Sequence, residues 1–348
     1  MLRPPSEPPA LTCPLADFPW TRSPMPAPAQ TIVLAWDGSH ATAACLAALA
    51  SQTYPNHRTI LVDNGATPPI APPAEPPVTL LRLPENRGFA GGVNAGINAA
   101  LAAGAAFVWL LNDDAQAPPD TLEKLVAAAA ADPRIGIASP VIRNADDHGR
   151  PAFTAGRIDP TTLGFDFTDS ATTAAAWAQE APDRIWAVGT AMLLRRELLE
   201  AIGGFDEDLF AYWEDNDICL RAMRAGFRTV MVPDAAVLHP NGDPTTGEAA
   251  RPPYYHYFMA RNHLLVLRKN GGWRVNARPL LWALLRMRRE VARYPGRPAI
   301  QAAIRHGVWD GLRGSTGRYT AAVAASSRLG QAVLVLAGLA ARLRPTRG

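Results

Sequence analysis

The chain has 348 residues, 48% of them hydrophobic, which is enough for one large or two ordinary domains with a true core. Its formal net charge is only +3, and we expect no nucleic-acid partner. Three cysteines, Cys13, Cys45 and Cys219, are widely spaced and follow neither a metal nor a disulfide pattern, so a reducing cytoplasm fits best. No stretch reaches the roughly 18 apolar residues of a membrane span, and the N-terminus lacks the basic start and apolar core of a signal peptide.

Residues 1–30 contain nine prolines and are predicted to form a loose arm. Residues 31–142 alternate between short apolar runs and Ala-rich segments, a pattern typical of strands and helices in turn. The predicted strands are 31–36, 59–62, 78–83, 107–111 and 135–142, and the predicted helices are 41–52, 89–103 and 119–131. Strands that alternate with helices of this length predict a mostly parallel sheet covered on both faces.

The second half of the chain is less regular. Residues 144–184 are polar and weakly patterned, and we expect a variable surface segment there. The later elements are a strand at 186–194, a helix at 196–202 stopped by Gly203, short strands at 229–232 and 235–238, and tail helices at 254–269, 278–293, 299–312 and 319–343. We therefore expect an arm (1–30), an α/β domain (31–253) and a basic helical region (254–348).

Charge is unevenly distributed along the chain. Residues 1–250 hold 16 Lys/Arg and 29 Asp/Glu, a net charge of −13, whereas residues 251–348 hold 18 and 2, a net charge of +16. One interpretation is that acidic side chains cluster at a metal site and that the tail arginines cover solvated helix faces. The other is that the tail faces an anionic membrane or polyanion. A peripheral position at the inner face of the membrane and homo-oligomerisation both stay open.

Three aspartates, Asp37, Asp63 and Asp114, lie just past the ends of predicted strands. Ligands of parallel sheets bind beyond the carboxyl ends of the strands, so this shared placement indicates a binding site at one edge of the sheet. Asp63 begins the sequence Asp-Asn-Gly, which by itself is also an ordinary strand-end turn.

Two acidic segments carry most of the chemical information. Asn112-Asp113-Asp114 follows the apolar run 107–111, and carboxylates at the end of a buried strand suit Mg²⁺ or Mn²⁺ together with substrate phosphates. Glu214-Asp215 opens a predicted helix that ends near Arg224, where the helix dipole favours ionised carboxylates. A carboxylate near a hydroxyl can take its proton as a new bond forms. One acidic site for a metal and another for proton abstraction indicate a transferase that uses a nucleotide-activated donor.

The segment from Asn86 to Gly96 is rich in glycine and lies between a predicted strand and helix. Small residues let the backbone approach a ligand, and Arg87 is placed to meet a phosphate. The spacing matches neither the dinucleotide fingerprint nor a phosphate-binding Gly-x-x-x-x-Gly-Lys loop. Close helix–sheet packing through the glycines is the alternative explanation.

These segments occur in this order within residues 30–270, together with Tyr-Trp-Glu-Asp-Asn-Asp-Ile-Cys-Leu-Arg at 212–221. They resemble the family 2 glycosyltransferases, most closely the rhamnosyltransferase-like and galactofuranosyltransferase-like members. The resemblance implies a GT-A-type α/β catalytic domain with a mostly parallel sheet flanked by helices, followed by a helical C-terminal region. It also implies inverting, metal-dependent transfer of rhamnose, galactofuranose or a similar sugar from a UDP- or dTDP-linked donor to a glycan or lipid-linked acceptor, in cell-wall or polysaccharide biosynthesis.

The resemblance assigns residues to the donor. An aspartate at the position of Asp63 contacts the base or ribose in the family, and Asp113 is placed near the ribose or sugar. Ala66 stands where the family often has Ser, and Trp36-Asp37 stands where relatives commonly have Tyr-Asn. The expected donor-binding residues are Trp36, Asp37, Asp63, Asn86, Arg87, Gly88, Gly92, Asn94, Asn112 and Asp113.

The resemblance also assigns the metal and the base. It implies that Asp114 and His239 hold Mg²⁺ or Mn²⁺, and a nitrogen ligand favours Mn²⁺. A structural role is the alternative for a lone histidine after a strand. Asp215, 24 residues before His239, is the expected base, and Glu214 lies towards the acceptor.

Other residues in or near the predicted helix that begins at Glu214 have more than one interpretation. Thr190 lies where relatives approach donor or acceptor, and Trp213 either stacks under an acceptor sugar or is a core aromatic. Asp217 and Arg221 are spaced i, i+4, so a salt bridge within the helix is the simpler account. The aromatic stripe at 254–258 is expected to serve packing.

Two other functional classes remain in view. The first is a scaffold that binds a nucleotide sugar without turnover, although the intact acidic pairs argue against it. The second is a nucleotidyltransferase on a similar sheet, which would release pyrophosphate from a triphosphate instead of a nucleoside diphosphate.

Overall fold

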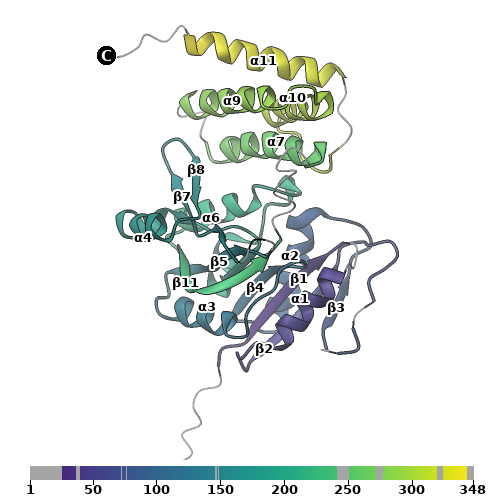
Figure 1. Ribbon diagram of the computed structural model, residues 1–348, viewed down its shortest axis with the longest axis vertical. Coiled ribbons are helices and arrows are strands. Elements are labelled where there is room, and N and C mark those ends of the chain that lie inside the picture. Colours follow the sequence, from purple (N-terminus) through teal and green to yellow (C-terminus); the bar gives the residue numbers. More distant parts are fainter. Residues whose placement is uncertain are drawn as a thin grey trace, which may run out of the picture.

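The computed structural model describes residues 26–36, 40–71, 73–75, 77–145, 147, 149–240, 251–271, 277–319 and 324–342. An α/β part built around one large sheet occupies the lower half of Figure 1, and a stack of helices lies above it. Most of the predicted N-terminal arm, and with it Cys13, lies outside the described residues.

An eight-stranded sheet forms the centre of the α/β part. Its order is β11-β5-β10-β4-β1-β2-β3, and β6 pairs with β5 outside this path. The strands span Ala29–Ala35 (β1), His57–Asp63 (β2), Thr79–Arg82 (β3), Phe107–Asn112 (β4), Ile135–Asn144 (β5), Pro151–Phe153 (β6), Ala191–Arg195 (β10) and Arg228–His239 (β11). β10 runs antiparallel to β4 and β5, whereas β1–β4 and the β5–β11 pair are parallel. The sheet is therefore mixed and mostly parallel, which confirms the predicted fold class.

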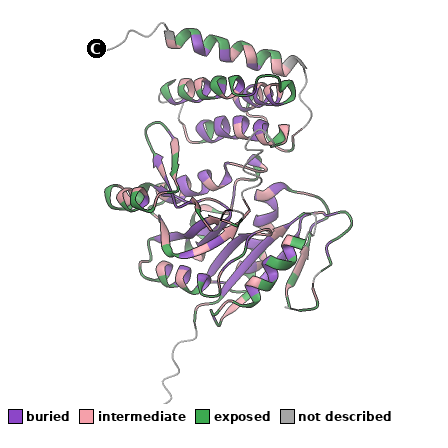
Figure 2. Cartoon of the chain, in the orientation of Figure 1, coloured by how far each residue is buried: buried purple, intermediate pink, exposed green. Residues whose placement is uncertain are grey.

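Helices cover both faces of this sheet, and its central strands are buried (Figure 2). The helices of the α/β part are His40–Ala50 (α1), Gly88–Ala102 (α2), Thr121–Ala130 (α3), Ala171–Glu180 (α4), Arg196–Ile202 (α5) and Glu214–Arg224 (α6). Glycines let α2 approach β1 closely: a Cβ added at Gly96 would lie 2.7 Å from Ile32 Cγ2. Close packing through small residues is therefore one real use of the glycine-rich segment.

The segment 144–184 differs from its expectation. It contains helix α4 and the strands Ala155–Asp159 (β7) and Gly164–Thr168 (β8), which form a second, three-stranded sheet, β8-β7-β9, with the following strand Ile185–Trp186 (β9). Trp186 holds this unit together, because its indole Nε1 donates to the carbonyl oxygen of Asp166 at 2.9 Å and its ring packs 5.2 Å from that of Phe153. The single strand predicted at 186–194 is accordingly split into β9 and β10, which belong to different sheets.

The C-terminal part is helical, with Pro253–Lys269 (α7), Ala277–Ala292 (α9), Pro298–Arg313 (α10) and Ala324–Arg342 (α11). α7 packs against the α/β part and against α10, while α11 lies on α9 and α10 at the far end of the molecule (Figure 1). Among the described helices, none combines the length and apolar character that crossing a bilayer requires. The two short strands predicted at 229–238 join into the single strand β11, with a register shift between Val232 and Ala236.

Candidate active site

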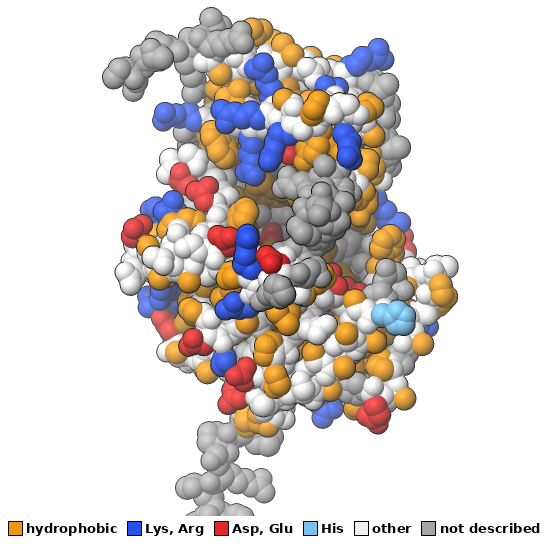
Figure 3. All heavy atoms as spheres, viewed as in Figure 1, with side chains coloured by type: hydrophobic (Ala, Val, Ile, Leu, Met, Phe, Trp, Pro, Cys, Tyr) orange, Lys and Arg blue, Asp and Glu red, His pale blue; other side chains and the backbone are white. Residues whose placement is uncertain are grey.

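A pocket of about 590 Å³ lies where the ends of β1, β2 and β4 meet the C-terminal helices. Its walls come from distant parts of the chain: Leu34, Ala35, Trp36, Asn64, Asn86, Gly88, Phe89, Asp113, Phe210, Ala211, Tyr212, Tyr254, Phe258, Arg318 and Tyr319. The carboxyl ends of parallel strands are where such sheets bind ligands. Acidic side chains lie mainly on the α/β part in Figure 3, whereas Lys and Arg dominate the helices above it.

Four of the expected donor-binding residues line this pocket, namely Trp36, Asn86, Gly88 and Asp113. Asp113 also accepts a hydrogen bond from Thr42 Oγ1 at 3.0 Å. Gly88 adopts a left-handed backbone (φ +73°), and a side chain there would clash with the carbonyl oxygen of Phe210. The backbone at Gly88 therefore needs glycine in order to lie against the loop at 210–213.

Other expected donor residues lie outside the pocket lining. Asp63 is fully buried, and its carboxylate accepts hydrogen bonds from Ala66 N at 2.8 Å, Ile70 N at 3.0 Å and Arg82 Nε at 3.0 Å. These contacts shape the loop after β2 and leave the neighbouring Asn64 to line the pocket. Asp37 lies outside the described residues.

Three more residues from the glycine-rich segment serve packing and loop anchoring. Arg87 pairs with Glu207 at 2.8 Å instead of facing the pocket. Gly92 lies against Leu34 and Asn64. Asn94 accepts a hydrogen bond from Phe205 N and donates to the Phe205 carbonyl, both at 2.8 Å.

Part of the pocket is formed by residues that the sequence did not indicate. In the aromatic stripe at 254–258, the buried His256, Tyr257 and Phe258 serve packing as expected, but Tyr254 and Phe258 also line the pocket. Arg318 comes from the segment after α10, where it pairs with Glu85 at 3.0 Å and donates to the carbonyl oxygen of Asn86. Nothing in the local pattern around Arg318 points to a site 233 residues earlier in the chain.

Asp114 and His239 lie together as expected, with His239 Nε2 3.1 Å from Asp114 Oδ1. Asn112 Nδ2 lies 3.3 Å from the same imidazole nitrogen. The side chains of Asp114 and His239 remain partly exposed, so they can contact a ligand. The described residues contain no cluster of three or more metal-ligating side chains. One carboxylate and one imidazole fit a divalent cation whose remaining positions are taken by substrate phosphates and water, as is common for Mg²⁺ and Mn²⁺.

Glu214 and Asp215 begin α6, where the helix dipole supports their charge. Asp215 accepts hydrogen bonds from Gly189 N at 3.1 Å and from Asn216 N at 2.8 Å. Within the described chain, Glu214 Oε2 has no hydrogen-bond partner although the residue is only 7% exposed. Burial raises the pKa of Glu214, and the charge of Asp215 raises it further. Burial also raises the pKa of Asp215, while the backbone donors from Gly189 and Asn216 lower it. Raised carboxyl pKa values of this kind suit proton transfer near neutral pH.

The backbone that leads into these carboxylates is strained. Phe210, Tyr212 and Trp213 all have positive φ angles, between 65° and 73°. Each such conformation costs on the order of 1 kcal/mol or more for a residue with a side chain, and persists only when neighbouring structure holds it.

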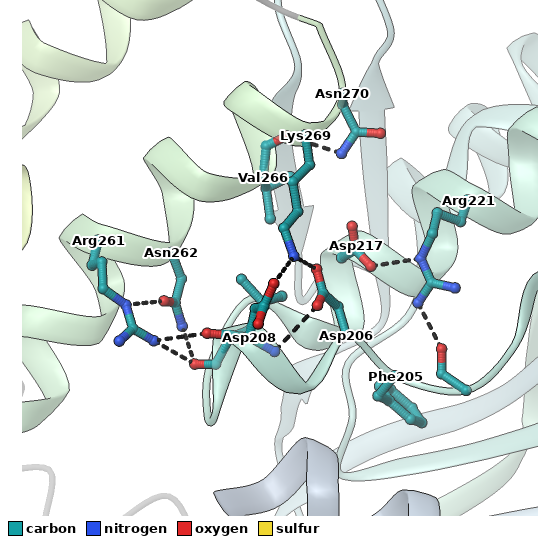
Figure 4. Close-up of polar contacts among 12 residues, drawn as sticks. Phe205, Asp206, Asp208, Asp217, Arg221, Arg261, Asn262, Val266, Lys269 and Asn270 are labelled. Atoms are coloured by element: carbon teal, nitrogen blue, oxygen red, sulfur yellow. Dashed lines mark hydrogen bonds and ion pairs between the residues drawn. The ribbon is translucent and has the colours of Figure 1, made fainter. Parts of the chain in front are cut away.

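Helix α7 supplies that support (Figure 4). The fully buried Asn262 directs its Nδ2 amide at three carbonyl oxygens, those of Leu209, Ala211 and Tyr212, each at 2.8 Å. Arg261 donates to the Leu209 carbonyl at 2.8 Å and to Asn262 Oδ1 at 2.8 Å. The helical region thus fixes the turn at 209–213 directly before Glu214 and Asp215.

The remaining residues of this element have structural roles. Trp213 is buried and stacks on His263 with ring centroids 4.2 Å apart, so it packs as a core aromatic, although it also lines a cavity beside α7. Thr190 is buried, and its carbonyl accepts from Asn112 N at 2.9 Å. Asp217 and Arg221 form the predicted salt bridge at 2.6 Å, and Arg221 also binds the Gly204 carbonyl at 2.8 Å.

Comparisons with known proteins agree with this arrangement. Residues 26–253 match the family model "Glycosyltransferase like family 2". The chain is 32% identical over 264 residues to N-acetylglucosaminyl-diphospho-decaprenol L-rhamnosyltransferase of Mycobacterium tuberculosis (strain CDC 1551 / Oshkosh), covering 69% of this chain and 83% of that protein. It is 33% identical over 200 residues to galactofuranosyltransferase GlfT1 of the same organism, covering 56% and 64%. It is 26% identical over 261 residues to dTDP-rhamnosyl transferase RfbF of Shigella flexneri, covering 70% and 82%.

Among solved structures, TarS of S. aureus superposes with a TM-score of 0.53 at 16% identity. The match covers 90% of this chain and 53% of that one, so the chain spans about half the length of TarS. At this level of identity the likeness shows a shared fold alone.

Replacement of Asn262 by alanine should loosen the turn before Glu214. It removes the side-chain donor from the carbonyl groups of Ala211 and Tyr212, while the Leu209 carbonyl keeps Arg261, and we expect the free energy of unfolding to fall by about 2–3 kcal/mol. Urea denaturation measures this loss, and hydrogen exchange at residues 208–213 localises it. The control is Asn56→Ala, which removes a single hydrogen bond to the Pro26 carbonyl near the surface. Equal losses in the two variants, or unchanged exchange at 208–213, would contradict the assignment.

Proposed function

The chain belongs to glycosyltransferase family 2, and on that premise we propose that it transfers a sugar from a nucleoside-diphosphate donor to a hydroxyl group of a glycan or lipid-linked acceptor. The observation that carries the proposal is the pair of adjacent carboxylates at the start of α6, the buried Glu214 and the half-buried Asp215, next to the turn that lines the donor pocket. A glycosyltransferase of this family is an enzyme, so neither the scaffold nor the nucleotidyltransferase alternative is retained.

The names of relatives narrow the donor. RfbF is named a dTDP-rhamnosyl transferase, and the M. tuberculosis proteins are named for transfer of rhamnose and galactofuranose. We therefore propose a UDP- or dTDP-linked donor carrying rhamnose, galactofuranose or a similar sugar, for use in cell-wall or polysaccharide biosynthesis. Trp36 and Tyr254 offer aromatic faces for the base, and Arg318 offers a cation at the rim of the same pocket.

Asp114 and His239 are the residues that would hold a divalent cation, Mg²⁺ or Mn²⁺. When bound, such an ion neutralises charge on the departing diphosphate. Asp113, adjacent to Asp114 and inside the pocket, is placed to bind hydroxyl groups of the ribose or sugar.

Asp215 is the proposed base. It receives the proton of the acceptor hydroxyl while that oxygen forms a bond to the anomeric carbon and the bond from this carbon to the diphosphate breaks. A single displacement of this kind from the opposite face inverts the anomeric configuration. The backbone donors from Gly189 and Asn216 orient the Asp215 carboxylate, and Glu214 is placed towards the acceptor.

The helical region (254–348) offers a surface for a membrane, and we propose a peripheral position at its cytoplasmic face. Helix α11 exposes an apolar stripe at the far end of the molecule, consisting of Leu329, Val335, Leu336 and Leu339. Leu336, the most exposed of them, is 63% accessible. Exposed Arg328 lies beside the stripe, and an apolar face flanked by basic residues suits a helix that lies in the interface of an anionic bilayer.

Activity should require a divalent cation held by Asp114. Replacement of Asp114 by alanine removes one of the two protein ligands, and we expect transfer from the nucleotide sugar to fall below detection while the thermal unfolding temperature is preserved. Excess chelator should have the same effect on the parent, and added Mn²⁺ or Mg²⁺ should reverse it. Full turnover by the folded variant, or in chelator, would show that the cation is dispensable.

The Asp215→Asn variant separates binding from chemistry. The amide keeps the shape of the side chain but cannot accept the proton, so we expect turnover to fall by about 10²–10⁴-fold. Donor affinity, measured by calorimetric titration, should stay within a few-fold of the parent. Asp234→Asn, at an exposed position in β11, is the matched control. Turnover within about threefold of the parent would move the base elsewhere, with Glu214 the next candidate.

Membrane binding is tested by flotation with vesicles. The protein should float with vesicles that contain phosphatidylglycerol and much less with neutral vesicles, and high salt should release it, because attraction between arginines and anionic lipid is screened within about 10 Å. Leu336→Glu places a carboxylate in the apolar stripe and should abolish flotation. If flotation changes neither with lipid charge nor with Leu336→Glu, the stripe does not bind the membrane. The stripe would then be expected to contact a second copy of the chain, and analytical ultracentrifugation would detect that dimer.

A further inference from the structure

A continuous groove runs along helix α9, beside α7 at one end and beside the β7–β8 hairpin at the other. It consists of three adjoining cavities of about 320, 430 and 550 Å³. Arg286 and Arg289 line both the first and the second cavity, while Trp282, Leu285 and Asp166 line both the second and the third. The shared walls show that the three cavities form one groove.

The inner end of the groove lies beside the proposed base. Trp213, the residue directly before Glu214, forms part of the wall of the first cavity. Glu214 itself is buried with an oxygen that has no hydrogen-bond partner in the described chain. The donor pocket lies on the other side of the same turn, where Tyr212 and Tyr254 line it. The groove and the donor pocket thus approach the start of α6 from two sides.

The groove carries a positive charge that its own carboxylates do not neutralise. The three carboxylates that line the groove have other partners. Glu290 pairs with Arg293 at 3.2 Å, Asp166 lies 4.0 Å from Arg157, and Asp159 accepts hydrogen bonds from Thr161 and Thr162. Arg286 and Arg289 form neither an ion pair nor a hydrogen bond within the described residues, and the guanidinium of Arg286 lies 6.0 Å from the centre of the Trp282 ring. The two arginines are three positions apart on α9, so they project from the same side of the helix. Two neighbouring guanidinium groups match the two phosphates of a diphosphate.

The outer part of the groove exposes aromatic side chains on both walls. Trp282 on α9 is 48% exposed, and Phe167 on the hairpin is 66% exposed. Together with Leu281 and Leu285 they form an apolar track that continues outward from the arginines. Aromatic and apolar side chains gathered in this way at the surface indicate a ligand or a membrane contact.

We propose that this groove binds the acceptor, and that the acceptor is a sugar joined through a diphosphate to a polyprenyl chain. Arg286 and Arg289 hold the diphosphate, and Trp282 and Phe167 contact the first isoprene units. The sugar extends past Trp213 towards Glu214. The assignment rests on the proposed function, because it supplies the second substrate for the same pair of carboxylates. The groove combines two adjacent unneutralised arginines with an apolar track, which matches a lipid diphosphate better than a free glycan.

Direct binding of geranylgeranyl diphosphate tests the proposal. This lipid is presented in neutral detergent micelles to the full chain, and affinity is measured by calorimetry. The double variant Arg286→Ala/Arg289→Ala should bind about tenfold or more weakly, because it loses charge-assisted hydrogen bonds to the diphosphate. Trp282→Ala should weaken binding of the lipid but not of inorganic pyrophosphate. Arg58→Ala, at an exposed position on β2, is the control and should bind like the parent.

Competing ligands decide between the lipid diphosphate and its parts. Geranylgeraniol, inorganic pyrophosphate and phosphatidylglycerol in the same micelles should each bind at least about tenfold more weakly than the complete lipid diphosphate. Equal binding of phosphatidylglycerol would make the groove a general anionic-lipid contact and overturn the proposal. Unchanged affinity in the double arginine variant would also overturn it.

Donor binding separates this inference from the proposed function. The double arginine variant should bind the nucleotide sugar, and hydrolyse it slowly in the presence of Mn²⁺, as the parent does. Loss of lipid-diphosphate binding with intact donor hydrolysis supports the groove. A parent that binds the donor but not the lipid diphosphate refutes the groove alone, whereas a parent that binds no nucleotide sugar refutes the proposed function.

Discussion

The hydrogen bonds from Asn262 and Arg261 to the turn at 209–213 are the constraint on which the candidate site depends. The turn contains three residues in the left-handed region, a conformation that a chain with ordinary side chains does not hold unaided. The same turn lines the donor pocket through Phe210, Ala211 and Tyr212 and leads directly into Glu214. The helical region is therefore part of the catalytic architecture, because it sets the position at which α6 begins.

Burial next to this turn sets the electrostatics of the site. Removal of water from around Glu214 and Asp215 raises the pKa of both, and the adjacent charge of Asp215 raises that of Glu214 further. The helix dipole and the Gly189 amide offset part of this cost for Asp215, whereas Glu214 Oε2 has no such partner in the described chain. Glu214 and Asp215 are neighbours in the chain but have different environments. Because their environments differ, one carboxylate of such a pair can act as the base while the other binds the substrate.

The uneven distribution of charge along the chain also has a structural outcome. Part of the basic tail meets the acidic domain at the junction: Lys269 lies between Asp206 and Asp208, and Arg318 reaches Glu85 at the donor pocket. Through these contacts part of the tail packs on the α/β domain and offsets some of its negative charge. Arg286 and Arg289 lie on the groove instead, and the apolar stripe of α11 lies at the end away from the sheet. The helical region therefore has one face that packs on the α/β domain and other faces that remain accessible to ligands.

The amino-acid sequence was sufficient to predict the elements of residues 31–142 and the family, because strand and helix periodicity is local and the acidic motifs stand at element ends. It also placed Asp114 with His239, through a resemblance that preserves their spacing. It did not show that the Asp63 carboxylate is hydrogen-bonded to the loop after β2, that Trp213 is buried against His263, or that Arg318 reaches the pocket. Nor did it show the β7–β8 hairpin, whose strands are held by Trp186 from a later segment. Each of these features depends on contacts between residues far apart in the chain. Whether a side chain lines a pocket or is buried in the core is therefore set by tertiary packing and cannot be read from a local pattern.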